Sequence, residues 1–180
     1  MFLGLDLSLR ATGIALLCPE ELSGWNITTL SPPDKFRDTD RLSYLREGIR
    51  EYLSGNNITL VAIEGYSYGS RNNQFYLGEL GGIIRLLLHD AGVPRIIVAP
   101  NILKKWATGV GNADKIAMAV CTYERFGLKF EDDNQCDAFN LATIAAAYAG
   151  EPMHRTTADH RKMLDVIRAN PLGLPKGRGK

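Results

Sequence analysis

The order of the predicted strands constrains the fold of this chain more than any other feature of its sequence. Residues 2–6, 13–18 and 25–30 are short runs of apolar or β-branched residues, and turn-forming residues separate them. Connections this short suit neighbouring strands that run antiparallel. The first 30 residues therefore predict an antiparallel sheet of three strands.

The next segment changes from consecutive strands to alternating strands and helices. Residues 38–53 carry leucine and isoleucine at helical spacing. Residues 59–64 and 95–99 have the composition of strands, and residues 74–91 between them are helical in period. This β-α-β order favours a right-handed crossover and parallel pairing. We therefore predict an α/β fold whose mixed five-stranded sheet has three antiparallel strands followed by parallel β/α units, flanked by helices.

The length of the chain suits one sizeable domain rather than two. Its 180 residues are 45% hydrophobic, and helical periodicity continues to residue 148. From residue 151 the apolar periodicity is lost, apart from a possible short helix over residues 158–167, and we expect the last ten residues to be disordered. The prediction is one domain over residues 1–150 and a basic, partly disordered tail over residues 151–180. That tail could add salt-sensitive DNA affinity or merely increase solubility.

Charge and hydropathy exclude some classes of partner. The formal net charge of +1 provides no overall attraction to nucleic acid or membrane, so any binding depends on local charge. No apolar stretch approaches the roughly 18 residues needed to cross a bilayer. The three cysteines are scattered, which argues against disulfides or a zinc site. We expect a cytoplasmic protein with no membrane partner.

Three acidic residues follow or begin apolar segments. Asp6 and Glu64 each end a predicted strand, and Asp137 lies near the start of an almost wholly apolar helix. A charge in such a place is costly unless it has a partner. Carboxylates that converge from strands and a helix are typical of Mg²⁺ sites. Two such ions ~4 Å apart would stabilise the attacking and leaving oxygens in phosphodiester hydrolysis.

Each acid also has a structural explanation. Asp133 or Asn134 could cap the helix that carries Asp137, or lie beside Asp137 on one helical face as further metal ligands. Asp6 could bind the amides of the turn that follows it, and Glu64 could pair with an arginine. Taken singly, each structural explanation is the better one.

The combination of motifs resembles a known family. The sequence is similar to the RuvC-like Holliday-junction resolvases of the RNase H-like superfamily, particularly the compact phage-encoded ones, over roughly residues 1–148. Four blocks in the family's order carry the resemblance: Gly4-Leu-Asp6-Leu-Ser-x-x-x-Thr12-Gly13, Val61-Ala-Ile-Glu64, Lys104-Lys-Trp-Ala-Thr-Gly109-Val-Gly111-Asn-Ala-Asp-Lys115 and Asp137-Ala-Phe-Asn-Leu-Ala. The third block is the most specific.

The resemblance implies a Mg²⁺-dependent endonuclease, with Mn²⁺ able to substitute and two ions in each active site. It implies that Asp6, Glu64 and Asp137 are metal ligands and catalytic residues, and that Lys104 and Lys115 contact phosphates or assist catalysis. The implied partners are branched DNA, especially four-way junctions, and a second copy of the chain, without a nucleotide cofactor. The implied setting is a bacterial or phage-infected bacterial cell.

One departure from the family pattern concerns the fourth metal-site residue. Bacterial members carry Asp or His three residues before the final Asp, whereas this chain has Asn134 there and Asp133 one position earlier. Asn134 could offer a carbonyl oxygen, and Asp133 could substitute as a ligand and catalytic residue.

Other predicted DNA contacts lie in a loop and beside the Gly-rich turn. Tyr66, Tyr68 and Arg71 follow Glu64 and could stack on unpaired bases, although a tyrosine there could also cover the edge of the core. Lys104, Lys105 and Lys115 could neutralise phosphates, and for Lys105 a solvated side chain is equally plausible.

Two further alternatives remain open. The helix over residues 74–91 carries Gly78, Gly81 and Gly82, which would let another helix approach in a dimer or would serve packing on the sheet. The function could also be a broader flap or fork nuclease, or a catalytically silent RNase H-like module that binds nucleic acid. An actin-like ATPase is disfavoured because it needs two lobes.

Overall fold

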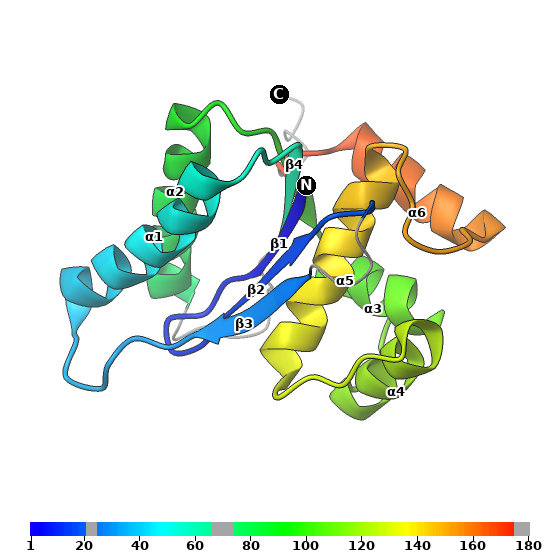
Figure 1. The fold of residues 1–180 in the computed structure, drawn as a ribbon, viewed down its shortest axis with the longest axis horizontal. Helices are drawn as coiled ribbons and strands as arrows, with labels where there is room; N and C mark the ends of the chain where they lie inside the picture. Colours follow the sequence, from blue (N-terminus) through cyan, green and yellow to red (C-terminus); the bar gives the residue numbers. More distant parts are fainter. Residues whose placement is uncertain (21–24, 66–73, 175–180) are drawn as a thin grey trace, which may run out of the picture.

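A five-stranded mixed sheet forms the centre of the computed structural model, which describes residues 1–20, 25–65 and 74–174 (Figure 1). Its strand order is β3-β2-β1-β4-β5. Strands β1, β2 and β3 pair antiparallel, whereas β1–β4 and β4–β5 pair parallel. The strands are β1 (Phe2–Asp6), β2 (Thr12–Leu17), β3 (Asn26–Leu30), β4 (Leu60–Glu64) and β5 (Arg95–Val98). The predicted three antiparallel strands followed by parallel units are confirmed.

Helices cover both faces of this sheet. Helices α1 and α2 lie on one side, and α5 crosses the other side with α3, α4 and α6 around it (Figure 1). The helices are α1 (Asp38–Gly55), α2 (Gln74–Asp90), α3 (Pro100–Thr108), α4 (Lys115–Phe126), α5 (Asp133–Tyr148) and α6 (Ala158–Ala169). None of the described helices is long and apolar enough to cross a membrane.

The alternation of side chains along the strands divides the core into two layers. Leu3 and Leu5 of β1 face α1 and α2, where they join Leu45 and Leu88 in one buried cluster. Phe2 faces the opposite way and packs in the layer under α3, α5 and α6. All five residues of β1 are buried, as expected for a central strand covered on both faces.

Two glycines let helix α5 lie directly on the sheet. A Cβ atom on Gly4 would stand 1.9 Å from the carbonyl oxygen of Ala138, and one on Gly13 would stand 2.1 Å from that of Asn134. Real Cβ atoms do not approach a backbone oxygen so closely, so only glycine permits this contact. The close approach brings the first turns of α5 over the end of β1, where Asp6 lies.

Helix α6 attaches the C-terminal segment to this layer. His160 is buried, its Nδ1 accepts a hydrogen bond from Thr157 N, and its Nε2 lies 3.1 Å from the carbonyl oxygen of Trp106. Since Nδ1 is an acceptor, Nε2 carries the proton and donates to Trp106. Helix α6 therefore packs on the domain that we predicted over residues 1–150.

The chain after α6 runs along the outer edge of β5. The amide of Ile97 donates to the carbonyl of Pro171 (2.8 Å), and the side chain of Asn170 bonds both the amide and the carbonyl of Leu174. Residues 171–174 thus form a bonded turn rather than the disordered segment expected from composition. The reason is the free edge of β5, which supplies a backbone donor that composition does not reveal.

Candidate active site

Three acidic side chains meet at one end of the sheet. Asp6 and Glu64 are the last residues of β1 and β4, and the carboxyl ends of parallel neighbours lie at the same edge. Asp137 projects from the second turn of α5, which crosses this edge. The electrostatic influence of Glu64 on Asp6, of Asp137 on Glu64 and of Asp6 on Asp137 shows that the three form one cluster. The predicted convergence of these residues is therefore present in the structure.

The turn after β1 is held by its own hydroxyl groups rather than by Asp6. Thr12 is fully buried, and its Oγ1 donates to the carbonyl of Ser8 (2.7 Å) and accepts from the amide of Ser8 (3.1 Å). The amides of Arg10 and Ala11 donate to Ser8 Oγ. Asp6 is therefore not needed to bind these amides, and its carboxyl is left for the cluster.

Burial dominates the electrostatics of the acids. Asp6 is only 9% exposed, and burial, together with the charge of Glu64 and a hydrogen bond to it, raises the pKa of Asp6 to about 8. Burial and the neighbouring Asp137 raise the pKa of Glu64 to about 7. Burial and the charge of Asp6 likewise raise the pKa of Asp137 to about 7. Strongly raised carboxyl pKa values that share a site are typical of functional clusters.

Two lysines lie close enough to oppose these shifts. Lys104 from α3 lowers the pKa values of Glu64 and Asp137, and Lys115 lowers those of all three acids. The neighbouring Lys105 lies on the exposed side of α3. The structure thus places Lys104 and Lys115 beside the acids and turns Lys105 to solvent.

The residues before Asp137 have three different environments. Asp133 accepts a hydrogen bond from Lys115 Nζ. Asn134 lies against Gly13, where its backbone contacts β2. Asp132 caps α5, since its Oδ1 accepts from Gln135 N (2.8 Å), and its Oδ2 accepts from Thr29 Oγ1 (2.6 Å). The suggestion that Asp133 or Asn134 caps this helix is therefore wrong.

Sequence reasoning missed Asp132 as a member of this region. Its charge contributes to the raised pKa of Asp6, and its bond to Thr29 ties the start of α5 to β3. A sequence signal existed, because Asp followed three residues later by Gln just before an apolar run is typical of a helix N-terminus.

The donor set suits a hard divalent cation. All three acids offer oxygen ligands, and their pKa values stay raised although Lys104 and Lys115 lie beside them, so the site can accept further positive charge. As the side chains are arranged here, Asp6 and Glu64 bond to each other, and no three Asp, Glu, His or Cys of the described residues are grouped to hold one ion. A cation at the acids would offset the charge repulsion that raises their pKa values, and their carboxylate oxygens are the donors it would use.

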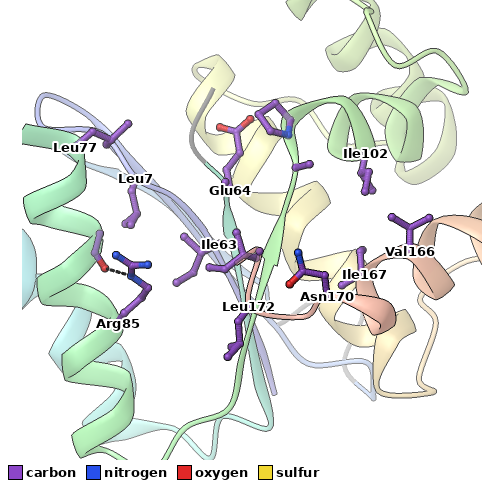
Figure 2. A pocket seen from close by; sticks show the side chains of 16 residues that line it. Leu7, Ile63, Glu64, Leu77, Arg85, Ile102, Val166, Ile167, Asn170 and Leu172 are labelled. Atoms are coloured by element: carbon purple, nitrogen blue, oxygen red, sulfur yellow. Dashed lines mark hydrogen bonds between the residues drawn. The ribbon is translucent and has the colours of Figure 1, made fainter. Parts of the chain in front are cut away.

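Glu64 also borders a cavity of about 260 Å³ between α2, the ends of β4 and β5, and α6 (Figure 2). Its walls are mainly apolar, with Ile63, Ile97 and Leu172 among them. Arg85 of α2 lines it and donates from Nε to the carbonyl of Gly81 (2.9 Å).

The predicted DNA contacts Tyr66, Tyr68 and Arg71 lie outside the described residues.

Comparison with known proteins places the chain in a family. No family model matches it. The crossover junction endodeoxyribonuclease RuvC of Chelativorans sp. is 30% identical over 158 residues, which cover 85% of this chain and 92% of that protein. The RuvC of Gloeobacter violaceus is 28% identical over 147 residues, with 78% and 84% covered. The chain belongs to the RuvC family of crossover junction endodeoxyribonucleases.

Solved RuvC structures share the fold. Thermus thermophilus RuvC superposes with a TM-score of 0.68 at 20% identity, covering 83% of this chain and 96% of that one. A structure of T. thermophilus RuvC in complex with Holliday junction substrate gives a TM-score of 0.67 at 20% identity, with 83% and 95% covered. The predicted RNase H-like fold class is confirmed. Whether the chain is a compact phage-type RuvC stays a prediction.

Proposed function

We propose that this RuvC-family protein is a divalent-metal-dependent endonuclease that cuts four-way DNA junctions. The observation that carries the proposal is the convergence of buried Asp6 with half-buried Glu64 and Asp137 at one sheet edge, with Lys104 and Lys115 beside them. A surface that only bound DNA would gain nothing from three acids placed near phosphates. Family membership and the named junction complex of T. thermophilus RuvC support the same substrate.

The acids and the lysines have different proposed roles in phosphodiester hydrolysis. We assign Asp6, Glu64 and Asp137 as ligands for two Mg²⁺ or Mn²⁺ ions, which when bound supply an activated water and Lewis acidity at the phosphate. Lys104 and Lys115 would neutralise the phosphate oxygens that otherwise face three carboxylates. In-line attack by water breaks the P–O3′ bond and leaves 5′-phosphate and 3′-hydroxyl ends.

The remaining site residues complete the proposal. Asp133 and Asn134 are the two candidates for a fourth metal-site residue. Tyr66, Tyr68, Arg71 and Lys105 are proposed as further DNA contacts outside the acidic cluster. A cytoplasmic location also stays a prediction.

We also propose that the protein works as a homodimer through helix α2. Leu80, Ile84 and Leu88 of this helix are buried against the core, so one side serves packing on the sheet. On its other sides Phe75 is 82% exposed, and a Cβ on Gly78 or Gly82 would meet no other described atom within 4 Å. An exposed aromatic beside two open glycines suits a second helix. Two sites in one dimer would nick strands of opposite polarity.

The test is cleavage of an end-labelled four-way junction and a matched linear duplex, with Mg²⁺ or with EDTA, by the wild type and Asp6→Asn. Paired nicks confined to the junction, absent in EDTA and in Asp6→Asn, are the expected result. Cutting of flaps and forks as well would indicate a general branched-DNA nuclease. Tight junction binding without cutting would indicate a silent binding module, and 3′-phosphate ends would refute the chemistry.

A further inference from the structure

The ends of two helices face each other at the rim of the acidic cluster. Lys115 is the first residue of α4 and Asp133 the first residue of α5, and their side chains form an ion pair. Asp133 lies one position before Asn134 in the sequence. Its partner Lys115 is one of the two lysines whose charge acts on the acids.

The backbones that carry this pair are fixed on both sides. Asp114 caps α4 by accepting from Ala117 N (2.8 Å), which sets the place of Lys115. Asp132 caps α5 and bonds Thr29 of β3, which sets the place of Asp133. The pair therefore joins two anchored helix starts, and neither backbone needs the ion pair to hold it.

The side chain of Lys115, by contrast, depends on the pair for its position. It is 76% exposed, and a lysine has four flexible methylenes that solvent leaves free. Its electrostatic effect on Asp6, Glu64 and Asp137 requires the ammonium to stay on the side of the acids. Asp133, whose side chain is 38% exposed, is the carboxylate of the described residues that bonds this ammonium.

Asp133 is more open to solvent than the most buried acid. Its side chain is 38% exposed and bonds Lys115 Nζ, whereas Asp6 is buried. Stability does not explain this pair, since exposed ion pairs contribute little.

We infer that Asp133 is a positioning residue, which holds the Lys115 ammonium over the three carboxylates instead of binding metal. This inference rests on the proposed nuclease function and deepens it. The ammonium has three N–H donors, so it can keep its bond to Asp133 while another N–H donates to a phosphate oxygen. Asp133 then orients the lysine, and Asp6, Glu64 and Asp137 remain the proposed ligands.

The test is a double-mutant cycle on junction cleavage combined with metal binding. We would measure kcat and KM for the wild type, Asp133→Asn, Asp133→Glu, Lys115→Ala and the double variant Asp133→Asn/Lys115→Ala. Mg²⁺ binding to each metal-free protein would be titrated by calorimetry. Asp159→Asn is the matched control, because Asp159 forms an exposed pair with Lys162 on α6.

A positioning role predicts that Asp133→Asn lowers kcat about tenfold or more. Asp133→Glu should restore most of this loss, and the double variant should be no slower than Lys115→Ala. The Mg²⁺ dissociation constant of Asp133→Asn should stay within about twofold of the wild type, since no ligand is removed, and Asp159→Asn should change nothing.

Other results would overturn the inference. If Asp133→Asn weakens Mg²⁺ binding about tenfold or more, Asp133 is a ligand. If the losses from Asp133→Asn and Lys115→Ala multiply, the two residues act independently. A wild type that cuts the junction in either case leaves the proposed function intact, whereas a wild type that neither cuts nor binds Mg²⁺ overturns both.

Discussion

Replacing Asp6 with asparagine should stabilise the metal-free protein while abolishing cleavage. Burial and Glu64 raise the pKa of Asp6 from 3.8 to about 8 in the folded state, whereas the unfolded chain keeps an ordinary carboxyl. Because the folded pKa is the higher one, the folded state binds more protons between pH 4 and 8. Stability therefore falls as the pH rises through this window. Asparagine has no charge to bury and can still donate to Glu64.

The pKa values set the size of the effect. A rise from 3.8 to about 8 corresponds to at most about 5 kcal/mol at pH 8, at about 1.4 kcal/mol for each pKa unit. Relaxation of the side chains and water near the carboxyl reduces this cost. We expect Asp6→Asn to raise the free energy of unfolding by about 1 to 3 kcal/mol at pH 8, and by well under about 1 kcal/mol at pH 4, which lies close to the ordinary carboxyl pKa of the unfolded chain.

Urea unfolding in EDTA at pH 4, 6 and 8 measures this difference directly. Groups outside the cluster titrate alike in both proteins, so subtraction gives the effect of Asp6 together with the change it imposes on Glu64 and Asp137. The exposed Asp165→Asn is the control. Mg²⁺ at 100 times its dissociation constant should then stabilise the wild type by about 2.7 kcal/mol and the variant far less. A variant that is less stable than the wild type at pH 8 would refute the reasoning.

Three further predictions follow from the structure. Gly4→Ala should destabilise the fold by about 3 kcal/mol or more in urea, because its Cβ would strike the backbone of α5 at Ala138; an unchanged midpoint would contradict the packing. Lys104→Ala should reduce kcat on a junction about tenfold or more, and Lys105→Ala should leave it within about twofold, since of these two lysines Lys104 is the one that acts on the acids; equal losses would argue against this division. Phe75→Glu on α2 should shift the mass measured by light scattering toward a monomer, and an unchanged dimer would exclude this face.

The fold was predictable because its signals are local. The change from consecutive strands to strand–helix alternation appears directly in the apolar pattern, and it gave the mixed sheet with its antiparallel and parallel parts. The C-terminal end was less predictable. Residues 171–174 carry no apolar periodicity, and they are ordered by a partner, the free edge of β5, that is distant in sequence.

The candidate acids were also predictable, but their individual partners were not. Strand ends and the helix start place Asp6, Glu64 and Asp137 together whatever their rotamers are. Which neighbour each polar side chain contacts depends on the spacing between helices. Asp132 rather than Asp133 caps α5, and Asp133 turns to Lys115, because α4 begins beside that turn.

The three acids destabilise the fold when they are ionised, so other contacts must hold them together. Three carboxylates with raised pKa values repel one another when ionised, so nothing in their own interactions would bring Asp137 to Asp6. The approach is imposed by the contact of α5 with Gly4 and Gly13 and by the buried apolar side of that helix. A sequence search for acidic residues alone therefore finds many pairs of acids that form no functional site. Acids that coincide with glycines required for close helix packing indicate a site where burial forces like charges together.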